Sequence, residues 1–170
     1  ELFGTATHVL PISTGTAANS IALASVTPPW GAVFAHRAAH IYNDECGAPE
    51  FFGHGLRVVP VDSPDGRLAP EALAQTIRAN EGHGVHSYLP AAVSLTQATE
   101  CGTVYGPGEV AAVCAVASDH GMATHMDGAR FANAVARLGC HPGDFTWRVG
   151  VEMLSFGASK NGCMAAEALL

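Results

Sequence analysis

The chain has 170 residues, of which 48% are hydrophobic and 14% are charged, and its formal net charge at pH 7 is −7. This length supports one globular domain with its own core but not two of ordinary size. Lysine and arginine form no run anywhere in the sequence. Because non-specific binding to nucleic acids needs clustered cations, we expect no nucleic-acid partner.

The sequence also lacks the features of export or membrane insertion. No apolar run reaches the roughly 18 residues of a membrane span, and the first residues contain no basic stretch followed by an apolar one. The five cysteines are odd in number and show no CxxC spacing, which is typical of reduced thiols. We therefore expect a cytoplasmic protein without membrane contacts. Because the sequence starts with glutamate and stops within an apolar stretch, we also expect a piece of a longer chain.

Short apolar runs with β-branched residues alternate with helical patterns along the chain. The expected strands cover residues 8–12, 32–36, 56–62, 88–95, 122–127 and 153–157. The expected helices cover residues 17–25, a segment opened by Pro70 and Glu71, and residues 107–120 and 129–138. This alternation predicts an α/β fold with a mostly parallel sheet and helices on both faces. Ligands of such sheets bind beyond the carboxyl ends of the strands, so the residues that follow the strands are the candidate site.

The first expected strand is followed by the sequence STGTAANSIALA, which begins at Ser13. Gly15 lets successive backbone amides point at one spot, Thr16 adds a hydroxyl, and the helix that follows contributes partial positive charge. These residues are suited to cradle a phosphate group. The alternative explanation is ordinary N-capping of the helix by a serine or threonine, and both interpretations stay open.

The second of these strand ends carries the sequence HRAAHIYNDECGAPEFF, which begins at His36. On a helix, His36, His40 and Asp44 would share one face with metal-ligand spacing. A metal-binding domain built on these three residues is therefore a hypothesis from a different class of function. For His40 there are two alternatives: it packs against the next segment, or it offers a flat ring on which an aromatic cofactor lies.

A carboxylate stands at the next strand end, where Asp127 closes the expected strand at residues 122–127 and Arg130 follows three positions later. A carboxylate at the buried end of a sheet is costly unless it faces a cation or a proton-bearing nitrogen. The partner of Asp127 is then either Arg130, in an ordinary ion pair, or the ring nitrogen of a bound heterocycle.

The last expected strand runs into SFGASKNG, which contains Lys160, the only lysine of the chain. A solvated surface amine is the simple explanation for this residue. However, an amine, a carboxylate, an imidazole and a phosphate cradle at the ends of parallel strands match the needs of pyridoxal phosphate (PLP). A lysine forms a Schiff base with PLP, an acid keeps its pyridine nitrogen protonated, and a loop holds its phosphate. Because four strand ends agree, we predict that Lys160 is the cofactor lysine.

These strand ends also carry a resemblance to a known family. Bacterial low-specificity L-threonine aldolases, which are fold-type-I PLP enzymes of the beta-eliminating lyase group, are similar in the segments TGTAANSIALA, AHIYNDECGAPEFF, LTQATECGTVY, HMDGARFANAVARLGC and LSFGASKNG. The resemblance covers essentially the whole chain and implies an aspartate-aminotransferase-like fold. It further implies that residues 1–170 are a partial PLP-binding large domain, without the N-terminal segment and the C-terminal small domain.

The resemblance also implies roles for single residues in cofactor binding. Lys160 corresponds to the lysine that forms the Schiff base, and Asp127 to the aspartate that faces the pyridine nitrogen. His40 corresponds to the histidine that stacks on the cofactor ring. Gly15 and Thr16 fall on positions that contact the phosphate.

The implied reaction cleaves β-hydroxy-α-amino acids such as L-threonine or L-allo-threonine to glycine and an aldehyde. Arg130 falls near cofactor and substrate, and either Glu45 or His40 takes the proton of the substrate hydroxyl. Where some threonine aldolases have a Thr-His pair near that hydroxyl, this chain offers Gln97 and Thr99. A phenylserine aldolase or another PLP-dependent β-eliminating lyase is the alternative within this class. The expected partners are a small amino acid and further copies of the chain, in a homodimer or a homotetramer.

Overall fold

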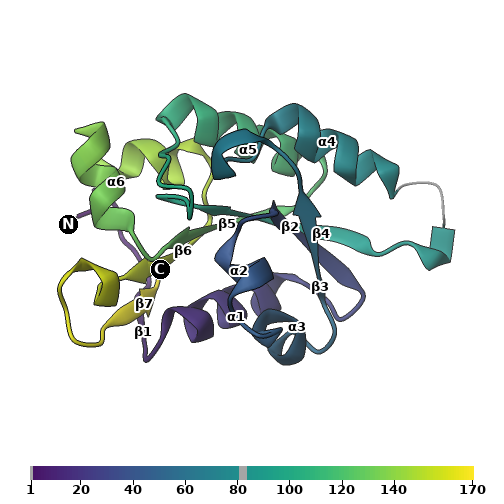
Figure 1. The fold of residues 1–170 in the computed structure, drawn as a ribbon, viewed down its shortest axis with the longest axis horizontal. Coiled ribbons are helices and arrows are strands. Elements are labelled where there is room, and N and C mark those ends of the chain that lie inside the picture. Colours follow the sequence, from purple (N-terminus) through teal and green to yellow (C-terminus); the bar gives the residue numbers. More distant parts are fainter. Residues whose placement is uncertain (1, 81–83) are drawn as a thin grey trace.

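The structure is a computed structural model that describes residues 2–80 and 84–170. Its centre is a seven-stranded sheet in the order β1-β7-β6-β5-β4-β2-β3 (Figure 1). The strands are β1 (Leu10–Ile12), β2 (Gly31–His36), β3 (Arg57–Val61), β4 (Leu89–Thr96), β5 (Ala123–Gly128), β6 (Met153–Gly157) and β7 (Glu167–Leu169).

Most of the sheet is parallel, as predicted. Strands β2 to β6 run in one direction, and β7 is antiparallel to β6. Within the described ranges β1 pairs with β7 alone, in an antiparallel ladder that joins Leu10 to Leu169. The expected α/β fold is therefore confirmed, with two differences. Strand β7 was not predicted, because three residues are too few to show a period of two, and β1 is shorter than the expected strand at residues 8–12.

Helices cover both faces of the sheet. The helices are α1 (Gly15–Val26), α2 (His40–Asn43), α3 (Ala48–Phe52), α4 (Pro70–Ala79), α5 (Pro107–Asp119) and α6 (Phe131–Leu138). Short 3-10 turns occur at η1 (Pro64–Gly66), η2 (Gly84–His86), η3 (Pro142–Phe145), η4 (Trp147–Val149) and η5 (Ser159–Asn161). Figure 1 shows α1 to α3 below the sheet and α4 to α6 above it. In residues 2–80 and 84–170 no helix is both long and apolar enough to cross a membrane.

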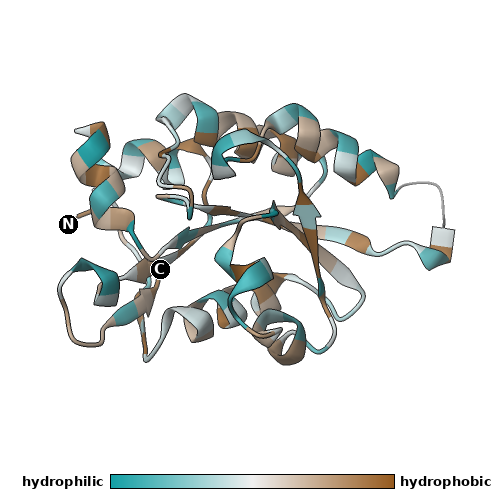
Figure 2. Ribbon diagram, in the orientation of Figure 1, coloured by the Kyte–Doolittle hydropathy of each residue, from teal (hydrophilic) through white to brown (hydrophobic). Residues whose placement is uncertain are grey.

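Alternate residues of the buried strands feed two separate apolar clusters. Phe34 of β2 belongs to the cluster under α4, α5 and α6, whereas its neighbours Val33 and Ala35 belong to the cluster with α1 and α2. A strand that is buried on both faces has a nearly continuous run of apolar residues in its sequence. β2 and β4 could therefore be predicted from the composition of these segments. Figure 2 shows that the helices, by contrast, mix hydrophobic and hydrophilic residues along each ribbon.

The α1 side of the three middle strands is polar although it is buried. Its buried polar residues are Ser94, Thr96, His125, Asp127 and Ser155. The register places Ser94 beside His125, and Asp127 beside both Thr96 and Ser155. Across the strands, Ser94 Oγ lies 2.9 Å from His125 Nδ1, and His125 Nε2 lies 2.9 Å from Ser155 Oγ. Both ring nitrogens of His125 therefore have a hydroxyl partner. His125 lies two residues before Asp127 in β5, on the same face of the sheet.

His125 makes the stability of the fold depend on pH. Its burial lowers the imidazole pKa from 6.5 to about 4. Between these values the unfolded chain binds a proton that the folded chain does not, so the free energy of unfolding should fall as the pH drops from about 6.5 to about 4. The loss due to this residue should reach about 3 kcal/mol. Urea unfolding of the protein and of His125→Gln across this range should show a flatter dependence in the variant; parallel curves would contradict the assignment.

A second feature that shapes the site is the close approach of β6 to the segment after β5. A Cβ added to Gly157 would lie 2.7 Å from Ala129 Cα and 3.0 Å from its carbonyl oxygen. Gly157→Ala should therefore cost about 1–3 kcal/mol in the free energy of unfolding and should displace the segment that leads to Lys160. The matched control is Gly108→Ala in α5, where a Cβ meets nothing within 4 Å. This control should leave stability unchanged or raise it by up to about 1 kcal/mol, and equal losses in both variants would refute the argument.

Candidate active site

The carboxyl ends of the parallel strands bring the predicted residues to one edge of the sheet. Asp127 lies near the end of β5, Lys160 lies in η5 just after β6, and α1 begins after β1. His40 is the first residue of α2, which follows β2, so four separate connections supply the side chains. The rule that ligands bind at this edge therefore selected positions that share one region of the fold.

Asp127 and Glu45 meet at a single amide group. The Nδ2 atom of Asn19 in α1 donates to Glu45 Oε1 at 2.8 Å and to Asp127 Oδ2 at 3.1 Å. The other Asp127 oxygen, Oδ1, accepts from the backbone N–H of Ala129 at 2.9 Å. Asn19, Glu45 and Asp127 are all buried, with 2%, 5% and 4% of their surface exposed. The edge therefore holds two buried carboxylates side by side.

His40 extends this chain of contacts toward solvent. Its Nδ1 lies 2.9 Å from Glu45 Oε1, and 28% of the imidazole side chain is exposed whereas the Glu45 side chain is fully buried. The hydrogen bond with Glu45 raises the pKa of His40, burial opposes this, and the charges of Asp127 and Lys160 act in opposite directions. His40, Glu45, Asn19 and Asp127 thus form one continuous polar row from α2 to β5.

The start of α1 contains both a cap and an open space. The Thr14 hydroxyl caps the helix by accepting from the Ala17 N–H at 3.1 Å, which confirms that capping occurs here. The helix begins at Gly15, two residues earlier than expected, so Gly15 and Thr16 supply its first amides. A Cβ placed on Gly15 meets no heavy atom within 4 Å. Capping by Thr14 leaves Gly15 and Thr16 available, so their predicted contact with a phosphate stays a prediction.

Lys160 has an exposed side chain, and its loop is fixed by its neighbour. The Asn161 amide donates to the carbonyl of Gly157 at 2.7 Å and to that of Ala129 at 3.2 Å, which ties the lysine turn to the segment after Asp127. The positive charge of Lys160 lowers the pKa of His40, against the larger effect of Glu45, which raises it. Its covalent role stays a prediction.

Of the two alternatives for the partner of Asp127, the ion pair with Arg130 does not form. Arg130 Nη1 instead lies 3.9 Å from Glu100 Oε1, and both atoms are buried without a hydrogen-bond partner among the described residues. Burial raises the pKa of Glu100, and the nearby negative charge of Asp127 adds to this effect. Only Gln97 and Thr99 were predicted from LTQATECG, although Glu100 also follows the end of β4 at the same edge.

Gln97 and Thr99 hold the loop after β4 together. The Gln97 side chain is fully buried, donates to the carbonyl of Tyr105 at 2.9 Å and accepts from its N–H at 3.0 Å. The Thr99 hydroxyl lies 2.7 Å from that of Thr103. The polar groups of both residues are therefore engaged within this loop.

The metal site expected from His36, His40 and Asp44 is wrong in that form. His36 ends β2 and His40 starts α2, so they do not share a helix face. One ring nitrogen of His36 bonds to the Ser63 carbonyl and the other accepts from the N–H of Ala38. Asp44 is exposed. In the part of the chain that the structure describes, three other side chains have the arrangement that a metal ion needs. One ligand atom from each of His40, Glu45 and Asp127 lies within 4.8 Å of the other two.

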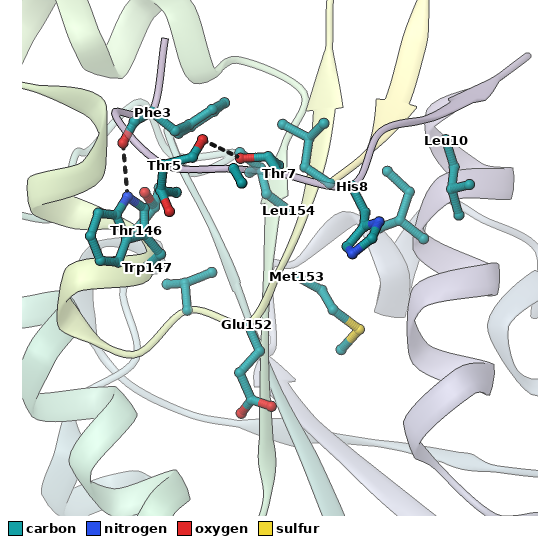
Figure 3. A pocket seen from close by; sticks show the side chains of 14 residues that line it. Phe3, Thr5, Thr7, His8, Leu10, Thr146, Trp147, Glu152, Met153 and Leu154 are labelled. Carbon is teal, nitrogen blue, oxygen red and sulfur yellow. Dashed lines mark hydrogen bonds between the residues drawn. The ribbon is translucent and has the colours of Figure 1, made fainter. Parts of the chain in front are cut away.

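An apolar cavity of about 410 Å³ lies elsewhere, between the N-terminal segment and β6 and β7. Figure 3 shows Phe3, Trp147 and Met153 around it, with the Trp147 Nε1 donating to the carbonyl of Phe3 at 2.9 Å. Met153 starts β6, so the cavity opens at the amino end of a strand whose carboxyl end leads to Lys160. None of the predicted site residues lines it. A larger hollow of about 570 Å³ is lined by Glu100 and Arg130, beside the polar edge.

The fold matches that of known threonine aldolases. The structure is similar to that of Leishmania major threonine aldolase, with a TM-score of 0.85, 34% sequence identity, and coverage of 95% of this chain and 46% of that one. A putative L-allo-threonine aldolase from Listeria monocytogenes shares the fold, with a TM-score of 0.72 at 17% identity. The chain therefore has the expected aspartate-aminotransferase-like fold of fold-type-I enzymes.

The chain belongs to the beta-eliminating lyase family, whose family model matches residues 1–170. It is 43% identical over 170 residues to the low specificity L-threonine aldolase of Pseudomonas sp. (strain NCIMB 10558), and 44% identical to that of Pseudomonas aeruginosa. All of this chain is covered in both comparisons, but only 49% of each relative. The resemblance inferred from the sequence is thus confirmed, and the chain spans about half the length of these curated relatives.

Proposed function

We propose that the protein is a PLP-dependent lyase that cleaves β-hydroxy-α-amino acids of the threonine type to glycine and an aldehyde. Support comes from the family and from 43–44% identity to two low specificity L-threonine aldolases. The observation that carries the proposal is the Asp127 carboxylate. It is buried at a strand end, and within residues 2–80 and 84–170 its hydrogen bonds come from an amide and a backbone N–H, not from a cation.

The residues at this edge fit the cofactor. A buried carboxylate without a cationic partner suits a protonated ring nitrogen. The first amides of a helix have no acceptor within the helix, and the open space at Gly15 gives a phosphate room to reach them. Lys160 supplies a primary amine, which arginine cannot replace in a covalent bond to an aldehyde. When bound, PLP supplies an electron sink that allows the bond between Cα and Cβ of the substrate to break.

The residues of this chain then divide the remaining work. Asp127 would balance the positive charge of the ring nitrogen, and Gly15 and Thr16 would hold the phosphate. The Arg130 guanidinium has a buried nitrogen without a hydrogen bond among the described residues and is suited to orient a carboxylate beside the cofactor. Lys160 would hold the cofactor through its primary amine.

His40 and Glu45 are the groups that move the substrate proton. Because the Glu45 side chain is fully buried and that of His40 is partly exposed, the proton of the β-hydroxyl passes first to His40. Glu45 stabilises the protonated imidazole through its hydrogen bond to Nδ1, which is also what raises the His40 pKa. The sequence left open which of the two residues takes the proton of the substrate hydroxyl. In this proposal His40 takes it and Glu45 supports His40.

The proposal is tested by combining spectroscopy with product analysis. The protein mixed with PLP should develop a visible absorbance band that borohydride removes. Glycine and aldehyde release should then be compared for threonine, allo-threonine and phenylserine, beside elimination from serine and cysteine. Failure of all three cleavages with active elimination would favour another β-eliminating lyase. Faster release from phenylserine than from threonine would favour the phenylserine aldolase.

A metal-binding function is the candidate from a different class, and it has one observation in its favour. His40, Glu45 and Asp127 bring three ligand atoms within 4.8 Å of one another. If metal analysis finds stoichiometric zinc and no absorbance band forms with PLP, the lyase proposal fails and the metal function replaces it. A band together with a metal-free protein would exclude the metal function.

We further propose that the whole protein is a homodimer or homotetramer in the cytoplasm, with residues 1–170 as part of its PLP-binding large domain. The five cysteines are free thiols in the structure, which suits a reducing compartment. Light scattering of the native protein would give the oligomeric state.

A further inference from the structure

We propose that Glu100 is a positioning residue, which directs the Arg130 guanidinium by its charge and leaves its N–H groups free for a substrate carboxylate; this rests on the function proposed above. Neither the motifs of the sequence nor the resemblance to threonine aldolases assigned a role to Glu100. Three features of the structure support this role: the gap between the two side chains, the hydrogen bonds of the loop that carries Glu100, and the contrast with Arg67.

The gap between the two charged groups is wider than a hydrogen bond. Arg130 Nη1 lies 3.9 Å from Glu100 Oε1, and both atoms are buried without a hydrogen-bond partner among the described residues. Opposite charges attract at this distance, more strongly in a buried place than in water. A hydrogen bond between nitrogen and oxygen would need about 3.2 Å or less. Glu100 therefore attracts the guanidinium without occupying its N–H groups.

The backbone at Arg130 is fixed, whereas its side chain depends on Glu100. Arg130 is the N-cap residue of α6. The N–H of Ala129 before it donates to Asp127 Oδ1 at 2.9 Å, and the carbonyl of Ala129 accepts from the Asn161 amide at 3.2 Å. Within residues 2–80 and 84–170, Glu100 supplies the one carboxylate within 4.0 Å of the guanidinium. Since 33% of the Arg130 side chain is exposed, a ligand can reach it.

The loop that carries Glu100 is held by hydrogen bonds on both sides of this residue. The N–H of Thr99 donates to the carbonyl of Thr103 at 3.0 Å, and the N–H of Gly102 donates to the carbonyl of Thr99 at 3.0 Å. The Thr103 hydroxyl donates to the carbonyl of Asp65 at 2.6 Å, which ties the loop to η1. A carboxylate on a loop with a fixed backbone can hold a neighbouring charge in one place.

A second arginine in the same hollow shows a different arrangement. Arg67 and Arg130 both line the hollow of about 570 Å³. Arg67 donates to Glu109 Oε1 at 2.6 Å and to Asp65 Oδ2 at 3.0 Å, so two of its N–H groups are occupied. Arg130 instead faces a carboxylate without a hydrogen bond. Of these two arginines, Arg130 is therefore the one that is directed and still free to bind an anion.

The test uses two substitutions of Glu100 and a matched control. Glu100→Gln keeps the size of the side chain and removes its charge, whereas Glu100→Asp keeps the charge and withdraws it by one methylene group. The control is Glu109→Gln, which removes the same charge from Arg67 in the same hollow. Glutamine at this position can still accept from the N–H of Gly106 at the start of α5.

Two properties are measured on the full-length protein. The first is the rate at which phenylglyoxal modifies Arg130 in the cofactor-free protein, followed by mass spectrometry. Arg137, which is exposed and lines the same hollow, serves as the internal reference. The second is the pair of constants kcat and KM for threonine with saturating PLP. The first property needs neither cofactor nor turnover.

In Glu100→Gln, Arg130 should react several-fold faster with phenylglyoxal while Arg137 reacts at an unchanged rate. The KM for threonine should rise about tenfold with kcat changed by less than about twofold, because the guanidinium no longer stands ready for the carboxylate. Glu100→Asp should show smaller changes in the same direction, and Glu109→Gln should show none. A pure charge effect has the opposite sign, since removal of a negative charge beside Arg130 would lower the KM for an anion.

An unchanged reactivity of Arg130 in the folded Glu100 variants would overturn the proposal, and so would a KM that is unchanged or lower. If Glu100→Gln does not fold, Glu100→Asp decides by the same two measurements. If Arg130 becomes more reactive but the unchanged protein binds no PLP and cleaves no threonine, the positioning of Arg130 by Glu100 stands and the proposed function fails.

Discussion

Replacing Lys160 with alanine should abolish the release of glycine and aldehyde from threonine, with a rate loss of about 10⁴-fold or more. The chain contains a single lysine, so no neighbouring amine can take over the covalent role. The exposed Lys160 side chain makes no hydrogen bond within the described residues, so its removal should leave the free energy of unfolding nearly unchanged. The measurement is steady-state turnover beside urea unfolding of the same preparations.

Lys160→Arg provides the control for charge. It keeps the positive charge near His40 but cannot form a covalent bond to an aldehyde, so it should be as inactive as Lys160→Ala. Both variants should also lose the absorbance band that borohydride removes. Full activity in Lys160→Arg would show that only the charge matters, and the assignment of Lys160 as the cofactor lysine would then be wrong.

Replacing Asp127 with asparagine should lower turnover by about 10²–10³-fold while PLP still binds. Asparagine has the same shape and can still accept the hydrogen bond from Ala129, but it carries no charge to keep the ring nitrogen protonated. Because the bound ring then withdraws electrons less strongly, the loss should appear in kcat and not in the KM for threonine. Steady-state kinetics with saturating PLP separates the two constants.

Asp44→Asn is the matched control for this prediction, since it removes a carboxylate that is exposed and close in sequence to the site. It should leave both constants unchanged. If Asp127→Asn turns over threonine at the rate of the unchanged protein, Asp127 does not face the ring nitrogen. The function would then need another acid, and Glu45 would be the first to test.

The fold was largely predictable because its strands have strong local signals. β2 to β6 are apolar runs separated by helices, and Pro70 and Pro107 mark the first residues of α4 and α5. The start of α6 was predicted two residues too early, because Arg130 is the N-cap residue and lies outside the helix. β7 could not be found from its sequence, since it has only three residues and its partner β1 lies at the other end of the sequence.

The site was predictable where a residue type stands out and hidden where it does not. Lys160, Asp127 and His40 were predictable because an ionisable side chain at the buried end of a strand is costly without a partner. Asn19 lies within α1, and its hydrogen bonds to Glu45 and Asp127 are seen only in the structure. The spacing of His36 and His40 suggested a shared helix, but the chain turns from strand to helix between them.

The pairing of β1 with β7 has a consequence for how the protein forms during synthesis. β1 leads directly into α1, yet its ladder partner β7 is synthesised only after β2 to β6. The helix that supplies the proposed phosphate contacts therefore has no docked strand before it until β7 has been translated. Early assembly should proceed through β2 to β6, and capture of cofactor should follow the pairing of β1 with β7.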